Sequence, residues 1–245
     1  MARTASLWIT ALGVFAAWLG LAHALGPTRL PSPLAVARAG SEMLAEGGLL
    51  LDVRASLTRV AVGFTAAALL GLAVAALVTL AGRWGDGLRA LIEALRPIPP
   101  IAWVPLAVLW FGLGDGSAWF IVGLGAFFPI AAQAVWGLGH CPEAYLELAR
   151  SLGASASLTL LRVRLPAALP ALAAGLRTGL GVAWTSVIAA ELVGAQSGLG
   201  YRIQLHRLTL ETEKVLAGMA CIGLCGALMG RLGNWLERRL AGDGA

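Results

Sequence analysis

Long apolar runs separated by short polar segments dominate this chain. A transmembrane helix needs about 20 mostly apolar residues. Six runs meet that requirement, and they cover residues 6–25, 57–81, 89–112, 117–138, 169–193 and 215–236. The pattern predicts an all-α, polytopic membrane protein with six transmembrane helices. No hydrophilic stretch is long enough for a separate soluble domain, so residues 1–245 are expected to form a single transmembrane domain.

The third run differs from the others because prolines interrupt it. Proline removes a backbone donor, and broken backbone at membrane depth is tolerated only when it packs in protein or lines a cavity. We therefore expect this run to face the interior of the bundle. The candidates for lining a translocation path are Pro97, Pro99, Pro100 and Trp103. For Trp103, packing in the core is the alternative.

The segment 139–168 is a polar loop between two apolar runs. Pro142 and Glu143 suit the first turn of a helix, and Gly153 suits its left-handed end. Ser155 suits the cap of a second short helix, so the loop is expected to contain two short helices at an angle. Leu148 and Leu152 are four residues apart and form one apolar edge. A polar element with such an edge is typical of a docking site for a soluble partner; an ordinary loop with snorkelling arginines is the alternative.

The segment 27–56 is expected to be a long connection on the opposite side, with a short interfacial helix over residues 34–46 that ends at Gly47. The first run has one early basic residue, Arg3, and no clear cleavage site before Pro27. We interpret it as a retained helix instead of a signal peptide.

Composition agrees with a membrane protein, since 58% of the residues are hydrophobic and only 13% are charged. Soluble domains carry about 25% charged residues. The segments on the side that contains Arg3 and the 139–168 loop hold 10 basic residues, counted with the adjoining ends of the spans, and the segments on the other side hold 6. By the positive-inside rule, both termini and this loop are predicted to be cytoplasmic. The net charge of +5 is explained by these loops and predicts no nucleic-acid partner.

Few residues have the properties of a reaction centre. A nucleotide-binding P-loop needs a lysine, and the sole Lys214 is in no such motif, so this chain is not an ATPase. Cys221 and Cys225 share a helix face, where packing explains them better than a metal. Outside the proline-interrupted third run, Glu191 is the only carboxylate inside a predicted span. It is a candidate gate or path residue, and the alternative is an interfacial carboxylate paired with a nearby arginine such as Arg202.

Two glycine pairs at helical spacing, Gly175 with Gly179 and Gly226 with Gly230, predict close approach of neighbouring helices. The alternative is that they reflect only the high glycine content of 32 residues.

The loop sequence Glu147-Leu-Ala149-Arg150-Ser-Leu152-Gly153, followed by Val163-Arg-Leu165-Pro166, resembles the EAA loop of ABC importer permeases. Leu148 replaces an alanine of that motif and Val163 an isoleucine. The segments Leu95–Gly114, Leu165–Trp184 and Ala190–Tyr201 are similar to permeases of taurine, aliphatic sulfonate and nitrate importers. The likeness covers residues 57–236, whereas residues 1–50 match only in layout. A lysine frequent in that family is absent near Ala118.

This resemblance implies the transmembrane domain of a type I importer, located in the cell inner membrane. Residues implied to couple to a separate ATPase are Glu147, Ala149, Arg150, Leu152, Gly153 and Pro166. The implied partners are two ATPase subunits that bind ATP and Mg, a second permease copy, and a periplasmic or lipid-anchored substrate-binding protein. No metal or cofactor is implied in this chain.

The implied substrate is taurine or another aliphatic sulfonate, with nitrate next. The alternatives are a relative that imports another molecule, such as a thiamine or riboflavin precursor, and an ion-coupled secondary transporter. A membrane-embedded enzyme is a third class, but it needs buried catalytic groups and the chain has no Gly-x-Ser-x-Gly motif.

Overall fold

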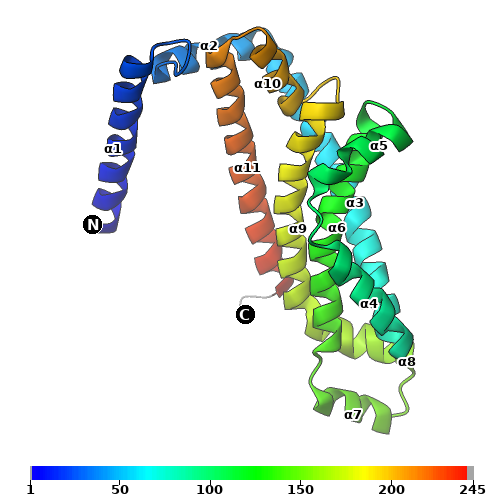
Figure 1. Cartoon of the computed structure of the whole chain (residues 1–245). Coiled ribbons are helices and arrows are strands. Elements are labelled where there is room, and N and C mark those ends of the chain that lie inside the picture. Colours follow the sequence, from blue (N-terminus) through cyan, green and yellow to red (C-terminus); the bar gives the residue numbers. More distant parts are fainter. Residues whose placement is uncertain (1, 242–245) are drawn as a thin grey trace.

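The computed structural model describes residues 2–241 as a chain of helices (Figure 1). In order they are α1 (Ala2–Leu25), α2 (Pro33–Ala45), α3 (Gly48–Leu80), α4 (Arg83–Leu95), the 3₁₀ turn η1 (Pro100–Trp103), α5 (Val104–Phe111), α6 (Asp115–Gly139), α7 (Glu143–Ser151), α8 (Ala156–Thr159), the π-turn η2 (Leu160–Arg164), α9 (Leu165–Gly194), α10 (Leu199–Leu208) and α11 (Thr212–Ala241). Within residues 2–241, five helices are long and apolar enough to cross a membrane, and a bent pair makes a sixth. The predicted all-α fold is confirmed.

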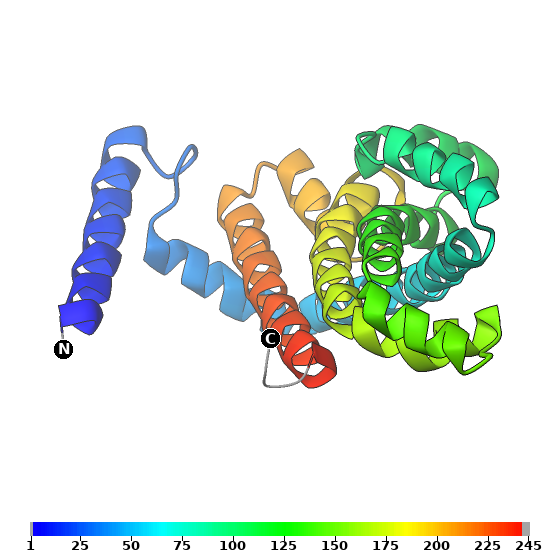
Figure 2. The ribbon, with the colours of Figure 1, turned by 90° about the horizontal axis from the view of Figure 1, so that it is seen from below.

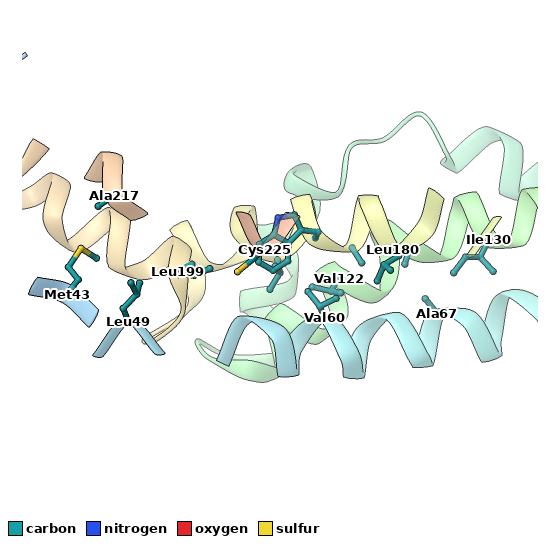
Figure 3. Close-up of a cluster of buried hydrophobic side chains, with 14 of the residues drawn as sticks. Met43, Leu49, Val60, Ala67, Val122, Ile130, Leu180, Leu199, Ala217 and Cys225 are labelled. Atoms are coloured by element: carbon teal, nitrogen blue, oxygen red, sulfur yellow. The ribbon is translucent and has the colours of Figure 1, made fainter. Parts of the chain in front are cut away.

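Three long helices, α3, α6 and α9, form the centre of the bundle, and α11 packs along α9 (Figures 1 and 2). Their shared core contains Val60, Val122, Ile130 and Leu180 (Figure 3). We refer to the two ends of this bundle as the α10 end, where α2 and α10 lie, and the α7 end, where α7 lies.

Glycines permit the close approach of α9 to α6. A Cβ on Gly179 would lie 2.6 Å from Ile130 Cγ1, and one on Gly175 would lie 2.8 Å from Gln133 Cβ. The predicted role of the first glycine pair is therefore confirmed. In the second pair only Gly226 faces a neighbour, the Trp184 indole, while a Cβ on Gly230 would meet nothing within 4 Å.

Helix α1 stands apart from the bundle (Figure 2). It carries exposed apolar side chains such as Trp8, Leu12 and Phe15, and one hydrogen bond of 3.1 Å joins its Trp18 Nε1 to the Pro31 carbonyl. In a membrane protein, such an apolar surface is suited to contact lipid tails or another protein chain, because either contact removes it from water.

The third predicted span is broken, as its prolines indicate. Its two arms, Trp84–Leu95 and Pro100–Phe111, meet at an angle of 93°. Pro97, Pro99 and Pro100 lie at this bend, since none of them can donate the backbone bond that would continue α4. The bend contacts α6 through η1, but Arg96, Pro97, Ile98 and Pro99 are exposed, so within residues 2–241 the broken backbone is not sheltered as expected.

The second span begins at Gly48 instead of residue 57, so the predicted outer connection is shorter than expected. Polar residues such as Asp52 argued against a span in the sequence. In the structure Asp52 and Arg59 are buried but hydrogen-bonded. The hydrogen bonds offset the free-energy cost of burying polar groups, which was the reason for predicting a later start of this span. The predicted short helix over 34–46 is confirmed as α2, and Gly47 follows it with a φ of +74°.

The second short helix of the 139–168 loop is not separate. The cap at Ser155 is confirmed, since its Oγ accepts the Leu158 N–H at 3.3 Å, but α8 continues through η2 into α9. Pro166 consequently lies in the first turn of α9 within a continuous helical run. The Leu165 N–H donates to Leu160 O, a π-type bond that takes up the irregularity ahead of the proline.

Candidate functional site

Helix α7 projects beyond the bundle at the α7 end (Figure 1). Its end has the geometry that the sequence predicts. Gly153 has a φ of +69°, its N–H donates to Arg150 O at 2.9 Å, and the Ala154 N–H donates to Ala149 O at 3.0 Å. These bonds satisfy carbonyls that the helix leaves open, and they fix the direction in which the chain returns to the membrane.

The two faces of α7 differ in burial. Leu146 and Ala149 are buried against the rest of the chain, whereas Leu148 is 58% exposed and Leu152 is 77% exposed. The predicted apolar edge therefore exists and is uncovered. Of the predicted coupling residues, Ala149 packs inward and Leu152 points outward.

The charges of α7 lie beside this edge. Arg150 forms an ion pair of 3.0 Å with Glu143, and both side chains are more than half exposed. Glu147 is exposed and makes no ion pair among residues 2–241. In water the pair between Arg150 and Glu143 contributes little to stability, so both groups are free to exchange partners.

An apolar groove of about 370 Å³ runs between α7 and the start of α9. Leu148 and Leu152 form one wall, and Val163 and Pro166 form the other. The groove brings the first and last parts of the EAA-like sequence together, which explains how Pro166 belongs to the same surface. Behind it, Arg164 Nη1 donates to Leu138 O at 2.8 Å and ties the return of the loop to the end of α6.

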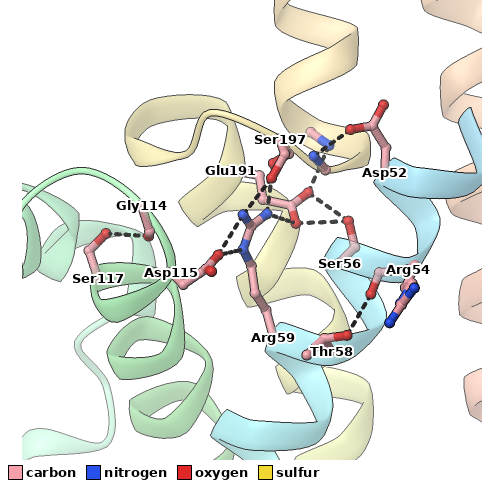
Figure 4. Close-up of polar contacts among 12 residues, drawn as sticks. Asp52, Arg54, Ser56, Thr58, Arg59, Gly114, Asp115, Ser117, Glu191 and Ser197 are labelled. Carbon is pink, nitrogen blue, oxygen red and sulfur yellow. Dashed lines mark hydrogen bonds and ion pairs between the residues drawn. The ribbon is translucent and has the colours of Figure 1, made fainter. Parts of the chain in front are cut away.

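A polar cluster with a buried centre and an exposed member, Asp115, lies at the α10 end (Figure 4). Its members come from α3, α6, α9, α10 and the turn before α10. They are Asp52, Ser56, Arg59, Asp115, Glu191, Ser197 and Arg202. We refer to this group as the α10-end cluster.

Glu191 is at the centre of the α10-end cluster and its side chain is fully buried. Its carboxylate accepts hydrogen bonds from Ser56 Oγ at 2.7 Å, Arg59 Nη1 at 2.8 Å and the Gly200 N–H at 2.9 Å. The sequence suggested Arg202 as the partner, and this pairing is wrong. Arg202 bonds to Asp52 instead, and Arg59 reaches Glu191 because it lies on the facing side of α3.

The remaining bonds of Arg59 join further segments. Its Nε donates to Asp115 Oδ1 at 2.8 Å at the start of α6, and its Nη1 donates to Ser197 O at 2.7 Å. Asp52 also accepts the Gly198 N–H at 2.8 Å. One guanidinium therefore joins α3, the start of α6, the α10 end of α9 and the α9–α10 turn, because it is planar and carries five N–H donors.

The proline bend borders a cavity of about 210 Å³. Pro99 and Pro100 line it together with Gly125 of α6 and Thr178 of α9. The structure thus brings together two of the candidate path residues. Pro97 is exposed at the bend, and Glu191 belongs to the α10-end cluster.

Trp103 follows this bend and packs in an apolar cluster with Val104 and Ala190. Its indole Nε1 is buried without a hydrogen-bond partner within residues 2–241. The Trp103 ring therefore packs in the core, which was the alternative considered for this residue. Its role in lining a translocation path remains a prediction.

Sequence reasoning missed most of the α10-end cluster. Arg59 lies inside the predicted second span, and a basic residue there needs a buried partner. The signal available in the sequence was Glu191, a carboxylate that also lies inside a predicted span. Asp115 and Ser197 lie in turns, and nothing in the sequence indicates their partners. Within residues 2–241 the structure contains no group of three or more acidic, His or Cys side chains placed to hold a metal.

The helical fold, with its broken span and projecting loop, defines a polytopic membrane protein. Residues 63–242 match the family model described as "binding-protein-dependent transport system inner membrane component", and the chain belongs to this family. It is therefore an ABC transporter permease. This finding favours the ABC permease over the secondary transporter and the membrane-embedded enzyme that the sequence analysis also considered.

Curated relatives cover most of the chain. The taurine transport system permease protein TauC of Escherichia coli is 38% identical over 88% of this chain and 80% of its own length. A putative aliphatic sulfonates permease of Bacillus subtilis is 34% identical, covering 93% and 83%. The nitrate import permease NrtB of Synechococcus elongatus is 31% identical, covering 94% and 88%.

Among solved structures, an inward-facing MetNI methionine ABC transporter chain aligns with a TM-score of 0.67 and 21% identity, covering 80% of this chain and 97% of its own. The predicted importer fold is confirmed by this likeness.

Proposed function

We propose that this chain is the permease subunit of an ATP-driven importer for a small sulfonate or oxyanion, with taurine or another aliphatic sulfonate first and nitrate second. The substrate class rests on the relatives, whose names specify taurine, aliphatic sulfonates and nitrate. Two copies form the translocation path between them, and a binding protein delivers substrate at the α10 end.

The observation that carries the coupling role is the uncovered apolar edge of α7. Leu148 and Leu152 are exposed on the helix that projects beyond the bundle end, and the groove beside them is open. A second protein that buries this edge gains hydrophobic free energy. We assign that position to a separate ATPase subunit, which binds ATP and Mg, one for each permease copy.

The proposed location is the cell inner membrane with both termini and α7 in the cytoplasm. The basic residues are more numerous on that side by 10 to 6, which supports this orientation.

The test is reconstitution of the permease with its ATPase and binding protein in proteoliposomes. Radiolabelled taurine should accumulate only when ATP and binding protein are both supplied, and unlabelled alkanesulfonate or nitrate should compete according to the binding protein's preference. Accumulation driven by an ion gradient without the ATPase would contradict the proposal.

A further inference from the structure

A second cavity of about 440 Å³ lies between α4 and α6, on the α7 side of the proline bend. Arg89, Arg96, Gln133 and Trp136 are among its walls. Its volume falls within the range of small-molecule sites, about 300–1,000 Å³. Such a cavity combines cationic, amide and aromatic surface, a set suited to a small anion with an apolar body.

The charges of this cavity do not cancel. Arg89 is paired with Glu93 at 3.1 Å, and Glu93 also lines the cavity. Arg96, the residue that directly follows α4, forms no ion pair or side-chain hydrogen bond within the part of the chain that the structure describes. The walls therefore carry one uncompensated positive charge, and it belongs to Arg96.

Arg96 also lines the 210 Å³ cavity that contains Pro99, Pro100 and Thr178. The same side chain thus borders both cavities, one at the bend and one toward the α7 end. A path that joined the two cavities would pass this guanidinium. A planar guanidinium matches the oxygen atoms of a sulfonate or nitrate through two parallel N–H donors.

We propose that the 440 Å³ cavity between α4 and α6 binds the oxyanion headgroup of the substrate on its way to the cytoplasm. Arg96 binds the headgroup oxygens, the Gln133 amide donates a further bond, and Trp136 packs on the carbon chain of a sulfonate. The cavity favours anions over neutral molecules at a step after the binding protein has released the substrate. This inference rests on the proposed function for the identity of the anion.

The first test measures charge selectivity in the permease purified with its ATPase. Ala132, another wall residue, is changed to cysteine in a background where Cys141, Cys221 and Cys225 are serine. The labelling rate with 2-sulfonatoethyl methanethiosulfonate is divided by the rate with the trimethylammonium analogue. Arg96→Gln should lower this ratio by roughly three- to ten-fold, because one nearby charge is lost.

Two controls separate a site from general electrostatics. Arg96→Lys keeps the charge and should keep most of the ratio. Arg231→Gln removes a basic residue of α11 that does not line the cavity, and it should leave the ratio unchanged. An equal fall in Arg96→Gln and Arg231→Gln would overturn the proposal, as would failure of both reagents to reach the cysteine.

The second test measures occupancy by protection. Methanesulfonate should slow labelling of the cysteine at position 132, whereas dimethyl sulfone, a neutral molecule of similar size, should not, and Arg96→Gln should remove the protection. Equal protection by both solutes, or by neither, would overturn the proposal. Neither measurement involves uptake, so a failed transport assay would contradict the proposed function while leaving the anion selectivity of the cavity standing.

Discussion

Arg59 and Glu191 form a buried ion pair, with side-chain exposures of 4% and 0%. Removing one partner of a buried pair leaves the other charged and unpaired, which costs about 3–5 kcal/mol. Arg59→Gln should therefore lower the thermal unfolding midpoint of the detergent-purified permease strongly. The double variant Arg59→Met with Glu191→Met should recover much of the loss, because neither member of this pair is left as an unpaired buried charge.

Arg177 supplies a matched control for this prediction. It pairs with Glu237 at 2.9 Å, but its side chain is 52% exposed. Arg177→Gln should shift the midpoint only slightly. If Arg59→Gln were as mild as Arg177→Gln, or the double variant worse than the single one, the ion pair would not be what holds the α10 end.

Glu211 fixes the turn between α10 and α11. Hydrogen bonds from Lys214, His206 and Thr209 lower the pKa of its carboxyl from 4.5 to about 2. A lowered folded-state pKa gives a contribution that is fully present above the unfolded value and lost only as pH falls toward 2. Acidification from pH 7 to 5 should thus leave the Glu211 contribution intact, whereas Glu211→Gln should remove it at both pH values.

Hydrogen exchange of the amides in 206–214 measures this effect. The two pH values are compared after correction for the intrinsic exchange rate. Faster corrected exchange at pH 5 that persists in Glu211→Gln would show that a different group controls the turn.

At the scale of elements, the contact of α6 with α9 depends on the space that glycine leaves. A Cβ on Gly179 would lie 2.6 Å from Ile130, so Gly179→Ala should destabilise the permease by about 1–3 kcal/mol. Gly181, two residues later on the same helix, has nothing within 4 Å of an added Cβ. Gly181→Ala should be neutral or stabilising, and thermal unfolding of the two variants side by side checks the difference.

The end of α7 also depends on one glycine, but for a conformational reason. A Cβ on Gly153 would meet nothing within 4 Å, while its φ of +69° disfavours a side chain by about 1 kcal/mol or more. Gly153→Val should leave the permease folded but reduce transport and loosen the ATPase. Gly153→Asn should retain function, because asparagine tolerates this conformation.

Uptake by proteoliposomes and co-purification of the ATPase are the measurements for α7. Wild-type transport in Gly153→Val would count against the coupling role, as would wild-type transport when Glu147, Arg150 and Leu152 are all changed to alanine.

At the scale of the whole molecule, α7 and α10 lie at opposite ends of the bundle (Figure 1). Cysteines introduced singly at Ser155 and Gln204, in a background without native cysteines, should be labelled from opposite sides of the membrane. Impermeant reagent applied to intact cells should reach only position 204. Labelling of both positions from one side would contradict the six-span arrangement.

The sequence by itself determined the class of this protein and much of its local structure. Apolar runs predict helices because a spanning helix satisfies the hydrogen bonds of its own backbone. Gly153 predicts the end of α7 and Ser155 the start of α8, because helix caps also depend on local backbone bonds. The break at Pro97–Pro100 was equally readable, since the missing donors belong to those residues. The EAA-like spacing then indicated the family that the comparisons confirm.

Only the tertiary structure decided which groups meet. Arg59 and Glu191 are 132 residues apart, and their pairing depends on how α3 rotates against α9. The extra turns of α3 and the union of α8 with α9 depend on the same packing, because buried polar groups become tolerable only when another element supplies their partners. The two cavities that share Arg96 likewise arise from the 93° bend, whose direction is set by the helices on which it packs.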